Sequence, residues 1–140
     1  MTVAFLLDRM TKVSKKALII TDGSESIQSI AQIISGALKD FKVKICAAAE
    51  FEGVDLLSAE IFFIGCEKNS PSSFKYLEDM LSHINLASRK CGIFSVNEIP
   101  LKYLAKIIKD SEADAGEPLL AHNGSVNQTA VNKWLKKIIN

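Results

Sequence analysis

Residues 16–31, KALIITDGSESIQSIA, predict a buried strand, a tight polar loop and the start of a helix in direct succession. Residues 17–20 form a short apolar run, as a strand covered on both faces requires. The six loop residues that follow carry no large side chain except Glu25. Apolar side chains then recur at helical spacing, at Ile27, Ile30, Ala31, Ile34 and Leu38. This succession is typical of a layered α/β fold.

The loop at residues 21–26 is the strongest functional indication in the chain. A strand that leads straight into a helix points free backbone N–H groups into the loop, and the helix dipole favours an anion there. Gly23 allows a sharp turn, while Thr21, Ser24 and Ser26 supply hydroxyl groups. These features predict a pocket for a phosphate or a carboxylate. A structural role is the alternative, because Ser24 or Ser26 could simply cap the helix.

Length and composition indicate one globular domain. A chain of 140 residues is long enough to bury roughly two-thirds of its unfolded surface. The formal net charge of +1 provides no overall field to attract nucleic acid or an anionic membrane, so neither is expected as a partner. No apolar stretch approaches the ~20 residues that a membrane-spanning helix needs.

The cysteines and the N-terminal residues favour a cytoplasmic protein. Cys46, Cys66 and Cys91 each lie in an apolar run, and no two of them have the spacing of a metal site. This placement is typical of reduced packing residues in a reducing compartment. Asp8 and Arg9 interrupt the apolar part of the N-terminal region, which argues against a signal peptide.

Residues 1–14 are assigned to an N-terminal extension and residues 15–140 to a single domain. The apolar residues of the extension recur at helical spacing, at Val3, Leu6, Leu7 and Met10. An extra structural turn or a frayed end is the favoured interpretation. A short amphipathic helix, lying across the domain or binding a partner, is the alternative.

Strands and helices are expected to alternate along the rest of the chain. Further strands are predicted at residues 43–49, 59–65, 90–96 and 117–121, with a turn and cap at 123–125. Helices are predicted to begin at Pro71, with Ser70 as its cap, at Pro100 and near Ala130, with at most one turn at 54–57. Such alternation requires crossover connections. It predicts a three-layer, doubly wound α/β fold with a five-stranded parallel sheet.

Ligands of doubly wound sheets bind at the carboxyl ends of the strands. Three loops are predicted at that edge, at residues 21–26, 66–70 and 95–99. A response-regulator receiver has the same architecture, but it needs an Asp where the third strand here ends in Ile64-Gly65-Cys66. A dinucleotide-binding domain is excluded because the chain has no G-x-G-x-x-G motif.

The chain resembles the flavodoxin family over most of its length. Thr21-Asp22-Gly23-Ser24-Glu25-Ser26 lies in the register of that family's phosphate loop, with Gly23-Ser24 in place of its central Thr-Gly. The segment from Glu60 to Gly65 is similar to the family's third strand, and Trp134-Leu135-Lys136-Lys137 is similar to its terminal helix. The resemblance implies a flavodoxin-like fold.

The resemblance also implies a flavin mononucleotide (FMN) held without a covalent bond. The first loop would wrap the phosphate, and the second and third loops would enclose the isoalloxazine ring. The protein would then pass single electrons to a redox partner protein. The implied cofactor-binding residues are Thr21, Asp22, Gly23, Ser24, Glu25 and Ser26 in the first loop, Cys66, Glu67, Lys68 and Asn69 in the second, and Ser95, Val96 and Asn97 in the third.

Departures from the family pattern lead to a second functional class. The second and third loops contain no Trp or Tyr to stack on a flavin, and Glu25 brings a carboxylate to the phosphate loop. Flavodoxins are usually acidic, whereas this chain is nearly neutral. The alternative is therefore a flavodoxin-like fold that has lost flavin and acts as a non-enzymatic binding or interaction module.

Other catalytic interpretations have less support in the sequence. His83 is expected in a helix and His122 at the end of the last strand, and structural roles are favoured for both. Cys66 could act as a nucleophile, but the sequence places no His or Arg beside it. Lys68 is the one cation near the predicted pocket. The sequence does not determine the oligomeric state.

Overall fold

The computed structural model describes residues 15–122 and 126–139. Its elements are, in chain order, β1 (Lys16–Thr21), α2 (Glu25–Ala37), β2 (Lys42–Ala47), α3 (Gly53–Ser58), β3 (Ile61–Gly65), the 3₁₀ turn η1 (Ser72–Phe74), α4 (Lys75–Leu81), β4 (Lys90–Ser95), α5 (Glu98–Ser111), β5 (Asp114–Ala115), β6 (Leu119–Leu120) and α6 (Gln128–Ile139). The predictions for residues 1–14 and for the turn at 123–125 lie outside the described residues.

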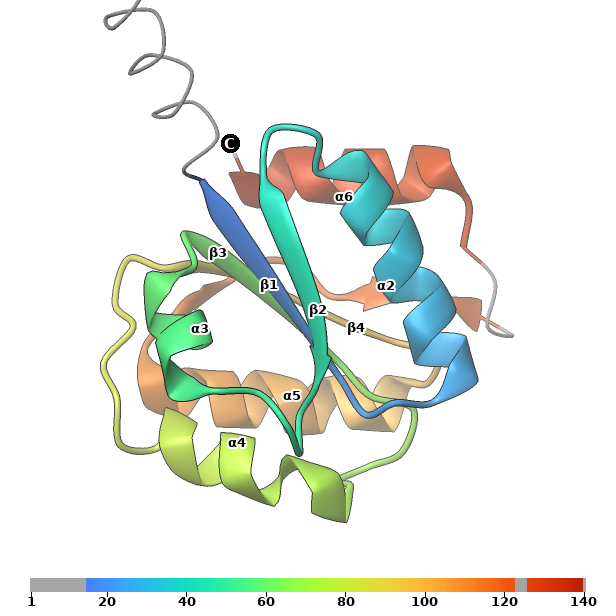
Figure 1. Ribbon diagram of the computed structural model, residues 1–140. Coiled ribbons are helices and arrows are strands. Elements are labelled where there is room, and N and C mark those ends of the chain that lie inside the picture. The colour runs from blue at the N-terminus through green and yellow to red at the C-terminus, as the bar shows by residue number, and fades with distance from the viewer. Residues whose placement is uncertain (1–14, 123–125, 140) are drawn as a thin grey trace, which may run out of the picture.

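The strands form one parallel sheet with the order β2-β1-β3-β4, and both β5 and β6 pair with β4. The first described strand, β1, therefore lies inside the sheet, and later strands are added on both sides of it. Helices cover both faces, α2 and α6 on one and α3, α4 and α5 on the other (Figure 1). The predicted three-layer, doubly wound α/β fold is confirmed.

Burial explains why the strand runs carry so many apolar residues. Along β1, Leu18 and Ile20 pack into the core beneath α4 and α5, while Ala17 and Ile19 pack into the core beneath α2 and α6. Every residue of β3 is buried in the same two-sided way. Because a strand alternates its side chains between two faces, a continuous apolar run is required wherever both faces are covered.

The fifth position of the sheet differs from the prediction. A single strand is predicted at residues 117–121, whereas the structure has two strands of two residues each, β5 and β6. Gly116 and Pro118 lie between them, and proline has no N–H to donate to a ladder. The carbonyl of Glu117 leaves the sheet and accepts the indole N–H of Trp134, with an N–O distance of 2.6 Å. This edge is therefore joined to α6 through a side chain.

Several predicted boundaries are also corrected. The second strand ends at Ala47 because residues 48–50 turn, and the third begins at Ile61 rather than Ala59. The helix expected to begin at Pro71 instead begins as a 3₁₀ turn at Ser72, after Ser70 with a φ of 47°.

Two helix predictions are corrected at their ends. α4 ends at Leu81, so His83 lies in a turn rather than in the helix. α5 begins at Glu98, two residues before Pro100, which its first turn accommodates. No helix of the described residues is both long enough and apolar enough to cross a membrane.

Candidate functional site

The three predicted loops meet at the carboxyl edge of the sheet. Residues 22–24 join β1 to α2, residues 66–71 join β3 to η1, and residues 96–97 join β4 to α5. Hydrogen bonds connect the second loop to both of the others, through Glu67 and Cys66. The structure thus brings together segments that lie more than 70 residues apart in the chain.

Asp22 organises the first loop from within. One carboxylate oxygen, Oδ1, accepts the backbone N–H of Ser24 at 3.0 Å and its hydroxyl at 2.7 Å. The other, Oδ2, accepts the backbone N–H of Glu67 at 2.8 Å. An Asp that accepts the N–H two residues further on forms an Asx turn. Asp22 therefore satisfies donors of the first loop and also ties that loop to the second.

Glu67, in the second loop, makes hydrogen bonds to the first turn of α2 and to the third loop. Its Oε2 accepts the hydroxyl of Ser26 at 2.7 Å, and its backbone carbonyl accepts the side-chain N–H of Asn97 at 3.0 Å. Ser26 lies in the first turn of α2, where the positive end of the helix dipole favours a carboxylate. The anion that this helix terminus faces is thus supplied by the chain itself.

The remaining polar residues of the first loop have structural contacts. Thr21 is fully buried; its hydroxyl accepts the N–H of Gly23 at 3.2 Å and donates to Gln28 Oε1 at 3.3 Å. Gly23 has a φ of 83°, a backbone conformation that residues with a side chain rarely adopt. Ser24 occupies the N-cap position of α2, but its hydroxyl donates to Asp22 rather than accepting from the helix. Glu25 is exposed to solvent.

Cys66 and Ser95 are buried at the carboxyl edge of the sheet. Both are fully buried, and the Ser95 hydroxyl donates to the Cys66 carbonyl at 2.6 Å while accepting the N–H of Asn97 at 3.2 Å. Burial, with a smaller contribution from the charge of Asp22, raises the pKa of the Cys66 thiol to about 12. A nucleophilic thiolate is therefore disfavoured at this position. These two residues hold the second and third loops together.

Two hollows remain open at this edge. The smaller, about 330 Å³, lies over the first loop and is lined by Asp22, Ser24, Glu67 and Lys68 among others. The larger, about 680 Å³, lies between the second and third loops and extends to β6. Asn69, Val96, Asn97 and His122 line the larger one, together with Ile99, whose 63% exposure is unusual for an isoleucine. Sequence reasoning did not single out Ile99.

The donor set fits a phosphate poorly. The hydroxyls of Ser24 and Ser26 and the backbone N–H of Ser24 already have carboxylate acceptors in Asp22 and Glu67. In the part of the chain that the structure describes, Lys68 is the only cation lining the smaller hollow, against two carboxylates. Two like charges 4 Å apart repel by roughly 4 kcal/mol at an effective dielectric constant of about 20. Among the described residues, the linings also contain no Trp, Tyr or Phe to stack on a flavin ring.

The described residues assemble neither a metal site nor an ionised thiol. No three His, Cys, Asp or Glu side chains in that part of the chain are placed to hold a metal ion. Cys46, Cys66 and Cys91 are free. Burial raises the pKa of the Cys46 thiol to about 11 and that of Cys91 well above its usual range. All three thiols are protonated near neutral pH.

Comparison with known proteins supports the fold. No family model matches the chain, and no curated protein matches its sequence. A short-chain flavodoxin associated with a non-canonical PDU bacterial microcompartment superposes with a TM-score of 0.72 and 14% identity, over 89% of this chain and 96% of that one. The flavodoxin of Streptococcus pneumoniae TIGR4 gives 0.73 and 14%, over 89% and 97%. Flavodoxin 2 from Bacillus cereus gives 0.72 and 16%, over 89% and 97%.

This similarity shows that the chain has the flavodoxin-like α/β fold. The resemblance drawn from the sequence is thereby confirmed at the level of the fold. The site residues implied by that resemblance lie at the carboxyl edge of the sheet, where the side chain of Asp22 pairs with Ser24 and that of Glu67 pairs with Ser26.

Proposed function

We propose that this chain is a flavodoxin-fold binding module that does not carry FMN. The observation that carries this proposal is the placement of Asp22 and Glu67, whose carboxylates accept the donors of the phosphate-loop register. A phosphate dianion would have to displace both carboxylates and then remain beside them. The absence of aromatic side chains from the linings removes about 1 kcal/mol or more of stacking.

The test is a fluorescence titration of the purified chain with FMN, with riboflavin alongside. We expect no saturable quenching of either flavin. A matched gain-of-function variant, Asp22→Ser with Glu67→Gln, removes both carboxylates and should bind FMN more tightly than the original chain. Saturable quenching by FMN but not by riboflavin in the original chain would overturn the proposal.

An FMN-dependent electron carrier is the second candidate. It is supported by the groove of about 680 Å³ between the second and third loops and by Lys68, which lines both hollows. In that case the first loop would hold the phosphate, and residues 67–69 and 96–97 would lie against the ring, with the buried Cys66 and Ser95 supporting them. A redox partner protein would dock at this edge. FMN would supply one-electron transfer. The same titration separates the two candidates.

We assign either function to a reducing compartment such as the cytoplasm. The support is that Cys46, Cys66 and Cys91 are all free, with the last two buried. Thiols in an oxidising compartment are more often paired. Labelling the thiols in intact cells with a membrane-permeant reagent, before and after reduction, would test this assignment.

A further inference from the structure

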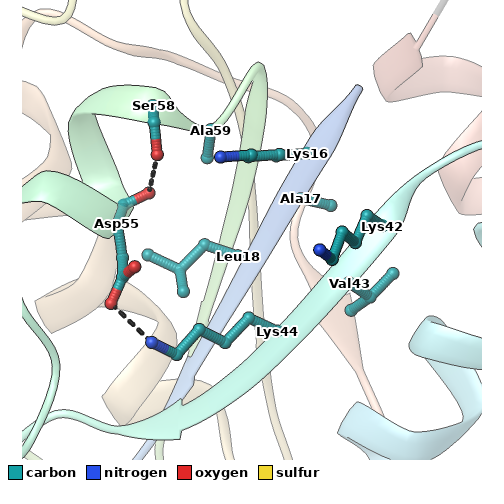
Figure 2. A pocket seen from close by; sticks show the side chains of 9 residues that line it. All are labelled: Lys16, Ala17, Leu18, Lys42, Val43, Lys44, Asp55, Ser58 and Ala59. Atoms are coloured by element: carbon teal, nitrogen blue, oxygen red, sulfur yellow. Dashed lines mark hydrogen bonds and ion pairs between the residues drawn. The ribbon is translucent and has the colours of Figure 1, made fainter. Parts of the chain in front are cut away.

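A third recess lies at the opposite edge of the sheet, where β1 and β2 begin. It has a volume of about 370 Å³ and is bounded by the first residues of these two strands and by the end of α3. Figure 2 shows the side chains of Lys16, Lys42 and Lys44 extending from the two strands over this recess, with Asp55 and Ser58 opposite on α3. It is separate from the loops of the flavodoxin-like site.

The strand register explains why three lysines face one recess. Lys16 and Lys42 are directly paired across β1 and β2, as are Leu18 and Lys44. Leu18 packs into the core beneath α4 and α5, so Lys16, two residues earlier, lies on the same face. Cys46 packs against that core too, which places Lys44 and Lys42 on this face.

The recess has an excess of positive charge. Among the described residues, Asp55 is the one carboxylate in the lining, and it pairs with Lys44 at an N–O distance of 2.8 Å. The hydrogen bond from Lys44 lowers the pKa of the Asp55 carboxyl, and the charge of Lys16 contributes to the same shift. Within the described residues, neither Lys16 nor Lys42 has a carboxylate at ion-pair distance. Like charges directly opposite on neighbouring strands are destabilising, and a bound anion would relieve that cost.

On the α3 side of the recess, the carboxylate of Asp55 opposes an anion, but the end of the helix itself does not. α3 ends here, and the carbonyl end of a helix carries partial negative charge. The Arg89 guanidinium donates to the carbonyls of Leu56, Leu57 and Ala59 and so satisfies that end. The floor is apolar, since Leu18 and Ala59 are only 2% and 1% exposed. An apolar floor with polar groups converging at the rim is the usual form of a small-molecule site.

We propose that this recess binds a small molecule carrying phosphate groups, with Lys16, Lys42 and Lys44 as its cationic contacts. Lysine is a common phosphate ligand because its ammonium acts as a mobile point charge. The volume suits a compact anion of the size of a diphosphate rather than a polypeptide segment. This ligand would be independent of the FMN question, because the two sites lie at opposite edges of the sheet.

Inorganic pyrophosphate is the probe. Titrated at low salt into the uniformly ¹⁵N-labelled chain, it should produce saturable amide shifts centred on residues 16–18, 42–44 and 55–59. The variant Lys16→Gln with Lys42→Gln should weaken binding by about tenfold or more, because it removes two of the three positive charges that attract the phosphate groups. Lys133→Gln with Lys136→Gln, which removes two exposed lysines of α6, is the matched control and should bind almost unchanged.

A further variant separates binding from a merely structural ion pair. Asp55→Asn removes the carboxylate that competes for Lys44, so it should tighten pyrophosphate binding. Absence of saturable shifts at millimolar pyrophosphate, shifts centred elsewhere, or equal losses in both lysine pairs would overturn the proposal. Binding of a poly-glutamate peptide without pyrophosphate binding would also overturn it, since the partner would then be an acidic polypeptide.

Discussion

At the residue scale, Asp22 illustrates how one side chain can decide the use of a loop. Its carboxylate accepts three hydrogen bonds, two from Ser24 and one from the backbone of Glu67. Asp22→Ala leaves these half-buried donors without their acceptor and should lower the free energy of unfolding by about 1–3 kcal/mol. Urea denaturation followed by circular dichroism measures this. The control, Asp110→Ala on the exposed side of α5, should change stability by less than about 0.5 kcal/mol, and equal effects would contradict the assigned role.

Close packing restricts which side chain a position can accept as strongly as hydrogen bonding does. A Cβ added at Gly65, the last residue of β3, would lie 2.3 Å from a ring carbon of Phe94. Since that ring is fully buried and cannot move freely, Gly65→Ala should destabilise the chain by about 1–3 kcal/mol. Gly36→Ala in α2 meets nothing within 4 Å and should stabilise the chain by up to about 1 kcal/mol. Thermal unfolding of both variants tests the pair, and changes of the same sign would refute it.

At the element scale, α6 closes the sheet at its interrupted edge. Trp134 packs on Phe63, with ring centroids 5.6 Å apart, and its N–H donates to the Glu117 carbonyl. Trp134→Phe keeps an aromatic ring but leaves that carbonyl without its donor, so unfolding should become easier by about 1–2 kcal/mol. In this variant, amide hydrogen exchange should accelerate more in β6 and α6 than in β1, relative to the original chain. Uniform acceleration across the sheet would contradict this local role.

Arg89 has the corresponding role for α3. It lies just before β4, and its guanidinium donates to three carbonyls at the end of this six-residue helix. Arg89→Lys cannot reproduce a planar set of donors, so it should destabilise the chain nearly as much as Arg89→Ala, by about 1–3 kcal/mol. Denaturant unfolding of the two variants provides the measurement. If Arg89→Lys were as stable as the original chain, the positive charge alone would be sufficient to stabilise the end of α3, and the role assigned to the planar donors would be wrong.

At the scale of the whole molecule, sequence patterns predict the elements better than the contacts of the site. Buried strands such as β3 are visible as apolar runs because both faces of the sheet are covered. The interruption of the sheet edge at Gly116 and Pro118 can be predicted from the local sequence, since proline cannot donate to a ladder. The pairing of Ser26 with Glu67 cannot be predicted in this way, because it joins residues 41 positions apart. The same applies to the three lysines, which converge only once the register of β1 and β2 is known.

The buried thiols limit the stability of the whole molecule at alkaline pH. Burial raises the pKa of the Cys66 thiol to about 12, above its ordinary value of 9.0, and burial also raises the pKa of Cys91. A thiol whose folded pKa lies above its unfolded value stabilises the fold below the unfolded value, and this contribution is lost as the pH rises toward the folded value. Between pH 9 and 12 the free energy of unfolding should therefore fall by roughly 1.4 kcal/mol per pH unit for each thiol that ionises only in the unfolded chain. Denaturant titrations across this range measure the slope. The variant Cys66→Ala should reduce it, and an unchanged slope would assign the alkaline limit to other groups.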